Sequence, residues 1–209
     1  MSGLGDFAIF GGTPAFPEPR HVGAPNIGDR ATLLRRFEEI LDRRILTNDG
    51  PLVREFEEVV RGISGVRNAV AMSNGTAALE VAIQAAGLTG EVITTPWTFI
   101  ATTHALLRQG IRPVFCDVDP RTHNIDPRRI EDLITERTTG ILAVHLWGRV
   151  CDVDALENIA RRHGLKLLFD SAHAFGCSSR GRMVGASATP RCSASTAPSS
   201  STPSRAARW

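Results

Sequence analysis

The N-terminal part of the chain contains two stretches whose apolar residues recur at helical spacing. Residues 29–44 (DRATLLRRFEEILDRR) place an apolar side chain every three or four positions, which predicts an amphipathic helix. Its apolar positions are Leu33, Leu34, Phe37, Ile40 and Leu41. After the turn-like sequence TNDGP, Pro51 is expected in the first turn of a second helix. That helix is predicted to bury Val53, Phe56, Val59 and Val60.

Beyond residue 67, short apolar runs alternate with helical patterns. The runs are NAVAM (68–72), EVITT (91–95), RPVFCDV (112–118), GILAVHL (140–146) and LKLLFD (165–170). Helices are expected to begin at Thr76, Phe99, Pro127 and Val153. The runs are continuously apolar, as expected for strands that helices cover on both faces of a mostly parallel sheet. The pattern therefore predicts an α/β fold, built as a three-layer α/β/α domain.

The composition changes abruptly near the C-terminus. Residues 186–209 contain seven Ser and three Pro but no acidic residue and no Leu, Ile, Val or Phe. Such a stretch cannot build a core, and composition alone favours a disordered tail. We therefore divide the chain into an N-terminal helical segment (1–66), an α/β domain (67–185) and an aberrant Ser/Pro/Ala-rich tail (186–209).

Composition and charge exclude several classes of protein. The 209 residues are 42% hydrophobic and 22% charged, which argues against a fibrous or wholly disordered protein. The formal net charge of +2 is too balanced to favour nucleic acid or an anionic membrane as partner. No apolar stretch is long enough to span a membrane, and the four cysteines form no C-x-x-C pair. We expect a cytoplasmic protein with reduced thiols and no metal site.

Two polar groups are predicted to follow strands at the ligand-binding edge of the sheet, the edge where parallel strands end. The Ser73-Asn74-Gly75-Thr76 turn precedes a helix, so it is suited either to holding a phosphate or to capping the helix. Asp170 closes an apolar strand, where its carboxylate either holds a protonated ring nitrogen or caps the next turn.

Aromatic residues follow other strands at this edge. Trp97 and Phe99 lie after the second run, where a ring either stacks on a planar ligand or packs in the core. His145 and Trp147 either line the same cleft or pack beneath it, and His173 is either a hydrogen-bond donor to a ligand or an interior histidine. The spacing of Asp117, Asp119 and Asp126 favours turns and caps over a metal site.

In this order, the segments resemble the DegT/StrS-type family of pyridoxal-phosphate-dependent sugar aminotransferases, which has the aspartate aminotransferase-like fold. The similarity runs from Phe10 to about Gly185. The matching segments are FGGTPAF, LTNDGPLVREFEE, SNGTAAL, PWTFIAT, PVFCDVDPRTHNIDP, VHLWGRVCDVDAL and FDSAHAFG. The resemblance implies that residues 1–185 form an incomplete large domain of a fold type I transferase.

The resemblance also implies the cofactor, pyridoxal 5'-phosphate, and the residues that bind it. Gly75, Thr76 and Ala77 match the turn and helix start that hold the phosphate, and Phe99 matches the aromatic residue that stacks on the pyridine ring. Asp170 matches the catalytic acid that pairs with the pyridinium nitrogen, and His173 matches the position near the ring hydroxyl. An ionised Asp keeps the nitrogen protonated, so that the ring accepts electrons during transamination.

The family reaction transfers an amino group, usually from glutamate or glutamine, to a keto carbon of a nucleotide-linked deoxysugar. Such reactions belong to deoxyaminosugar and antibiotic biosynthesis. The resemblance therefore implies a nucleotide-sugar substrate and an amino-acid donor as partners. It also implies a homodimer for a full-length member of the family, but not for a shortened chain.

The family reaction needs a lysine, which lies in an S-F-H-x-T-K segment expected soon after Gly185. The only lysine in this sequence is Lys166, which precedes the acidic position. Codons for residues 188–209 can be chosen so that a shifted reading frame encodes DAEVFSFHGTKFFNTFEGGAV, which contains that segment. We therefore hypothesise a frameshift, in the gene or in its sequencing, just before Ala188. The chain as given is expected to be truncated and inactive.

The sequence leaves three alternatives open. The chain resembles family members that use the same cofactor as sugar dehydratases, in which a histidine replaces the lysine, but the reconstructed HGTK disfavours this reading. A second possibility is a synthase that forms an aromatic amino acid. The third is a non-catalytic subunit that binds an active paralogue.

Overall fold

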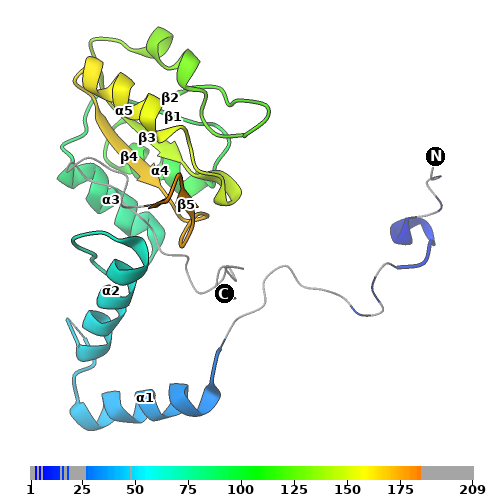
Figure 1. The fold of residues 1–209 in the computed structure, drawn as a ribbon, viewed down its shortest axis with the longest axis vertical. Coiled ribbons are helices and arrows are strands. Elements are labelled where there is room, and N and C mark those ends of the chain that lie inside the picture. Colours follow the sequence, from blue (N-terminus) through cyan, green and yellow to red (C-terminus); the bar gives the residue numbers. More distant parts are fainter. Residues whose placement is uncertain are drawn as a thin grey trace.

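A computed structural model of the chain describes residues 3, 5, 7–14, 16, 18, 27–47 and 49–184 (Figure 1). The tail predicted at residues 186–209 lies outside the described residues. So do the reconstructed lysine segment and Cys192. A single 3-10 turn, Ala8–Phe10, is the first described element.

The first two predicted helices form where the sequence places them. They are α1 (Arg30–Arg43) and α2 (Pro51–Ser64). The Asp29 carboxylate caps α1 by accepting hydrogen bonds from two backbone N–H groups of the first turn. The Arg36 guanidinium donates two hydrogen bonds, of 3.0 and 2.7 Å, to the Glu55 carboxylate and so links the two helices.

The predicted burial of the apolar face of α2 is wrong. Val53, Phe56 and Val59 are exposed, with Phe56 at 50%, and Val60 is only half-buried. Most apolar residues of α1 are exposed as well, among them Phe37, whereas Ile40 is half-buried. Figure 1 shows α1 and α2 extending away from the sheet, so their apolar faces have no sheet to pack against. None of the described helices combines the length and the apolar character that crossing a membrane requires.

The other described elements form a parallel sheet with helices on both sides. The strands are β1 (Glu91–Thr94), β2 (Arg112–Phe115), β3 (Thr138–Val144) and β4 (Lys166–Asp170). Their order is β2-β1-β3-β4, and every neighbouring pair is parallel. The helices are α3 (Gly75–Ala85), α4 (Ile100–Arg108) and α5 (Val153–Arg162). A short hairpin of β5 (Ser178–Ser179) and β6 (Arg182–Met183) follows the sheet.

Two apolar clusters lie on opposite faces of this sheet, because successive strand residues point to opposite sides. Val92, Leu142 and Leu168 pack with residues of α3 and α4. Their neighbours Ile93 and Ile141 pack on the other face with residues of α5. The predicted three-layer α/β/α architecture is therefore confirmed.

Two predicted elements differ from the structure. Residues 68–72 do not form a strand, because none of the described strands pairs with them and Val70 is 72% exposed. The helix expected from Pro127 is replaced by two 3-10 turns, η3 (Pro127–Arg129) and η4 (Glu131–Leu133). Ile130 between them is fully buried in the cluster on the α5 side, which holds the segment flat on the core.

Candidate active site

All four strands end at one edge of the sheet, which we call the carboxyl edge. Because the strands are parallel, the loops that follow β2, β1, β3 and β4 lie next to one another in that order. Helix α4 begins at this edge, directly after β1. Helix α3 begins there too, because its other end leads into the start of β1. Loops and helix N-termini therefore meet where α/β proteins bind their ligands.

Asp170 is the buried carboxylate of this edge, with 6% exposure. The Thr102 hydroxyl donates a 2.9 Å hydrogen bond to Oδ2, and the backbone N–H of Ala172 donates a 3.1 Å hydrogen bond to Oδ1. The Thr98 hydroxyl lies 2.8 Å from that of Thr102. Since Thr102 uses its single proton on Asp170, Thr98 donates to Thr102. Two hydroxyls in series thus fix the orientation of the carboxylate.

The Ser73–Thr76 turn caps α3 and leaves two backbone amides at the start of the helix without a partner among the described residues. The Asn74 side chain caps the helix by accepting a 2.9 Å hydrogen bond from the backbone N–H of Ala77. The backbone N–H groups of Gly75 and Thr76 have no partner among the described residues. These two amides and the positive end of the helix dipole can receive an anion, whereas the Ala77 amide is already used by the cap.

Phe99 and His173 also lie at the carboxyl edge. Phe99 is the N-cap residue of α4 and is 70% exposed, so it does not belong to the core. His173 follows β4 and is exposed, so it is not an interior histidine. Its Nδ1 accepts a 3.5 Å hydrogen bond from the backbone N–H of Trp147.

Three rings meet beside this site, and we call Trp97, His123 and Trp147 the ring cluster. The Trp97 ring stacks on His123 with centroids 6.2 Å apart, and it meets Trp147 edge-on at 6.1 Å. The rings of His123 and Trp147 are 5.5 Å apart. His123 and Trp147 both have left-handed backbones, with φ of 60° and 52°. This conformation costs about 1–2 kcal/mol for each residue with a side chain.

His145 packs beneath the edge and does not line it. Its ring is 2% exposed and stacks on Phe169, with the centroids 4.7 Å apart. Nδ1 accepts a 3.1 Å hydrogen bond from the backbone N–H of Cys151, so this nitrogen carries no proton. Burial lowers the pKa of His145 to about 4, because desolvation disfavours the charged ring.

The acidic residues after β2 make turns and caps, as the sequence predicts. Asp119 accepts hydrogen bonds from the backbone N–H groups of Arg121 and Thr122. Asp126 accepts one from the backbone N–H of Arg128. The Arg128 side chain also binds this carboxylate and lowers its pKa. Among the described residues, no group of His, Cys, Asp and Glu side chains has the arrangement of a metal site.

The opposite edge of the sheet, which we call the amino edge, holds charged groups of a different kind. Glu91 starts β1 and accepts hydrogen bonds from Thr135 (2.7 Å), Arg137 (2.7 Å) and Arg112 (3.2 Å), which lower its pKa. Lys166 starts β4, the strand that Asp170 ends. They are four positions apart in an extended strand, which separates them by about 13 Å. The only lysine of the sequence therefore lies at the edge away from Asp170.

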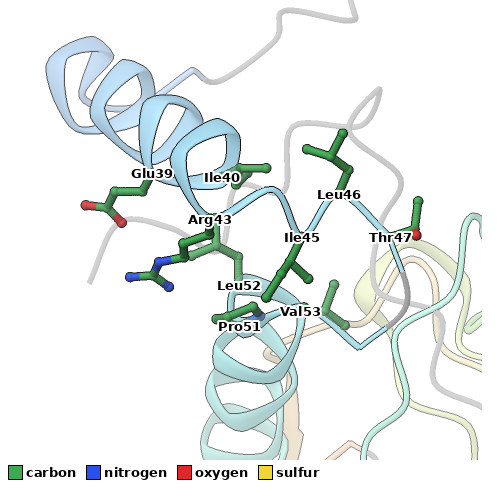
Figure 2. A pocket seen from close by; sticks show the side chains of 10 residues that line it. Glu39, Ile40, Arg43, Ile45, Leu46, Thr47, Pro51, Leu52 and Val53 are labelled. Atoms are coloured by element: carbon green, nitrogen blue, oxygen red, sulfur yellow. The ribbon is translucent and has the colours of Figure 1, made fainter.

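A cavity of about 120 Å³ lies far from this site in the sequence, between the end of α1 and the start of α2 (Figure 2). Its lining is largely aliphatic and includes Ile40, Ile45, Leu52 and Val53. It contains none of the residues of the carboxyl edge. The cavity therefore adds nothing to the candidate active site.

The sequence profile of the DegT/DnrJ/EryC1/StrS aminotransferase family matches residues 28–194, most of the chain. The chain belongs to this family. A dTDP-4-amino-4,6-dideoxy-D-glucose transaminase from Escherichia coli is 42% identical over 163 residues, which cover 78% of this chain and 44% of that protein. The resemblance inferred from the sequence segments is thereby confirmed.

Two solved structures share the fold of this chain. DesI, crystallised in the presence of its TDP-sugar product, superposes with a TM-score of 0.82 at 53% identity, over 88% of this chain and 47% of DesI. NtdA from Bacillus subtilis, with bound cofactor PMP, superposes with a TM-score of 0.69 at 32% identity, over 78% of this chain and 40% of NtdA. This DegT-family chain spans about half the length of the relatives it matches.

Sequence reasoning missed Thr98, Thr102 and His123. Thr98 directly precedes the N-cap of α4 and Thr102 lies in its first turn, so their hydroxyls meet at the start of that helix. His123 lies in a loop whose turn residues gave no indication that its ring meets those of Trp97 and Trp147. Only the strand order, which the sequence does not give, brings these loops together.

Proposed function

We propose that this chain forms the cofactor-binding part of a pyridoxal-phosphate-dependent sugar aminotransferase. The observation that carries the proposal is the placement of Asp170 and the α3 N-terminus at one edge of the sheet. Helix α3 packs against β4, since Leu79 and Ile83 share a buried cluster with Leu168. The Asp170 carboxylate and two amides without a partner among the described residues therefore border the same region.

The residues fit the two polar ends of pyridoxal phosphate. The N–H groups of Gly75 and Thr76 bind the phosphate at the positive end of the α3 dipole. Ala77, which we expected to share this function, contributes through its hydrogen bond to Asn74, which fixes the turn. Asp170 binds the ring nitrogen and holds a proton on it, while Thr102 and Ala172 prevent the carboxylate from turning away. When bound, the cofactor supplies an electron sink for transamination.

The exposed side chains of the edge complete the proposed cofactor site. Phe99 is exposed at the start of α4 and is free to lie against the face of the pyridine ring. His173 is proposed to lie near the ring hydroxyl. The hydrogen bond between its Nδ1 and Trp147 leaves Nε2 as the nitrogen that can donate to a ligand.

The substrate that we propose is a nucleotide-linked keto-deoxysugar, which receives an amino group from glutamate or glutamine. Support comes from the family, from a relative named for a dTDP-linked amino sugar and from a structure that contains a TDP-sugar product. Reactions of this class serve deoxyaminosugar and antibiotic biosynthesis.

The chain as given is proposed to bind the cofactor without a covalent bond and to be catalytically inactive. The family's chemistry uses a lysine, and Lys166 is about 13 Å from Asp170 along β4. The lysine is proposed to lie in the shifted frame of residues 188–209. The position of Lys166 is also compatible with a non-catalytic subunit that binds an active paralogue. Sequencing the nucleotides from codon 180 onward tests the frameshift, which is refuted if no one-base shift restores a frame containing a lysine.

A titration of the purified chain with pyridoxal phosphate, followed by absorbance, tests the cofactor site. We expect reversible binding that Asp170→Asn weakens about 10- to 100-fold, the loss of one charge-assisted hydrogen bond. Lys166→Met is the matched control and leaves the affinity unchanged. Equal affinity of Asp170→Asn and the wild type, or a borohydride-reducible adduct at Lys166, contradicts the proposal.

A further inference from the structure

The ring cluster is built by three separate loops at the carboxyl edge. Trp97 follows β1, His123 follows β2 and Trp147 follows β3, and these strands are neighbours. Asp170 ends β4, the next strand along. Along the edge the order is therefore His123, Trp97, Trp147 and Asp170. The ring cluster therefore lies beside the proposed cofactor site, on the side toward β2.

Polar contacts hold the loops of the ring cluster in place. The buried Asn124 side chain accepts a 3.0 Å hydrogen bond from the backbone N–H of Leu146. It also donates a 3.1 Å hydrogen bond to the carbonyl oxygen of Arg149. These contacts lie on either side of Trp147 in the sequence and adjoin His123. The left-handed backbones of both ring residues are thus maintained by a buried side chain, so the cluster is ordered before any ligand binds.

The two indoles remain accessible although they touch each other. Trp97 is 49% exposed and Trp147 is 61% exposed. The indole N–H groups of both have no hydrogen-bond partner within the described part of the chain. A large apolar ring that only packs in a core is buried, whereas these rings present surface at the edge where ligands bind.

A cation lies beside the ring cluster. The Arg149 guanidinium reaches across to the loop after β2, where Nη1 donates a 2.7 Å hydrogen bond to the carbonyl oxygen of Arg121. No carboxylate pairs with Arg149 among the described residues, whereas Arg128 and Arg137 each bind one. Its planar guanidinium therefore has N–H groups available for an anion such as a diphosphate.

We propose that the ring cluster and Arg149 bind the nucleoside diphosphate part of the sugar nucleotide, with the base stacked on an indole and the diphosphate at Arg149. The inference rests on the proposed function, because it takes the sugar end of the substrate to lie at Asp170. Strands are spaced about 4.8 Å apart, so β1 lies about 10 Å and β2 about 14 Å from β4 along the edge. An extended sugar nucleotide covers such a distance.

Calorimetric titration of the purified chain with thymidine diphosphate, without pyridoxal phosphate, tests the inference. Stacking of one base predicts that Trp97→Leu or Trp147→Leu weakens binding about 5- to 150-fold. Trp97→Phe and Trp147→Phe keep an aromatic face and are expected to restore most of the affinity. Arg149→Met is expected to weaken binding at least about 10-fold, and Arg67→Met, which removes an exposed arginine outside the edge, to leave it unchanged.

Three outcomes overturn the inference. One is wild-type affinity for thymidine diphosphate in both Leu variants. Another is Phe variants that bind as weakly as the Leu variants while all melt like the wild type. The third is glucose 1-phosphate binding as tightly as thymidine diphosphate and with the same dependence on the rings, which assigns the rings to the sugar. Because the titration uses thymidine diphosphate without pyridoxal phosphate, a failure of the cofactor site leaves its result unchanged and is distinguishable from a failure of this inference.

Discussion

The two edges of the same four strands differ in how their polar groups are satisfied. At the amino edge, the Glu91 carboxylate has three donors around it and two of them are arginines. At the carboxyl edge, the amides of Gly75 and Thr76 have no partner among the described residues, and Trp147 exposes a ring on a left-handed backbone. The polar groups of the amino edge bond to one another, whereas the carboxyl edge leaves groups available to a ligand.

This difference indicates that the amino edge contributes to stability and that the carboxyl edge contributes to function. Groups that satisfy one another stabilise the sheet but bind nothing else. Unpartnered amides, exposed rings and left-handed residues cost stability and are retained where a ligand uses them. Substitutions at the amino edge should therefore change stability alone, and substitutions of exposed groups at the carboxyl edge should change ligand affinity alone.

The largest expected effect concerns His145, which is buried beneath the carboxyl edge. Its pKa falls from 6.5 to about 4 on folding, so below pH 6.5 the unfolded chain takes up a proton that the folded chain does not. The stability present above pH 6.5 is lost as the pH falls toward 4, by about 3 kcal/mol. Urea unfolding at pH 7 and pH 4.5 measures this loss.

His145→Gln should remove most of that pH dependence, and the exposed His104→Gln should keep it. If both variants lose stability with pH as the wild type does, His145 is not the group responsible. The burial of His145 would then not give it the contribution to stability that the exposed groups of the carboxyl edge lack.

The next effect is expected at Gly140, in the amino half of β3. A Cβ at this position would lie 2.5 Å from Leu88 Cδ2 and 2.9 Å from the carbonyl oxygen of Lys166. Gly140→Ala should therefore destabilise the fold by about 2 kcal/mol, as overpacked cores do. In the folded protein, the affinity for pyridoxal phosphate should be unchanged. Thermal unfolding and cofactor titration below the melting temperature check both statements.

Gly62→Ala in α2 is the matched control, because a Cβ there meets no atom within 4 Å. It should stabilise its helix by about 0.5–1 kcal/mol. A Gly140→Ala protein that is as stable as the wild type but binds the cofactor weakly contradicts the separation of the two edges.

The smallest effect on stability is expected at Thr102. Thr102→Val keeps the shape of the side chain but removes the hydroxyl that donates to Asp170, which costs about 1 kcal/mol. Because the carboxylate loses its fixed orientation, cofactor affinity should fall about 5- to 10-fold. Thr103→Val removes a hydroxyl that bonds only within α4 and should leave the affinity unchanged. Equal losses of cofactor affinity in Thr102→Val and Thr103→Val contradict the proposal that the Thr102 hydroxyl orients Asp170 for the cofactor.

Local patterns predicted most of the fold. Continuous apolar runs located β1 to β4, and helical patterns located α1 to α5. The failures occurred where a second element decides the outcome. The run at residues 68–72 has no strand beside it among the described residues, and Phe56 has the spacing of a core residue without a core to enter.

The candidate site was only partly predictable. Asp170 and the Ser73–Thr76 turn were found because each adjoins the end of a recognisable element. The support of Asp170 by Thr102 depends on how α4 lies against the sheet, and the ring cluster depends on the strand order β2-β1-β3. Neither is encoded in a short stretch of sequence.

A crystal structure of this chain with pyridoxal phosphate tests the central claim most directly. We predict the phosphate within hydrogen-bond distance of the Gly75 and Thr76 amides and the ring nitrogen within hydrogen-bond distance of the Asp170 carboxylate. A cofactor seated elsewhere, or one whose ring nitrogen points away from Asp170, contradicts the account.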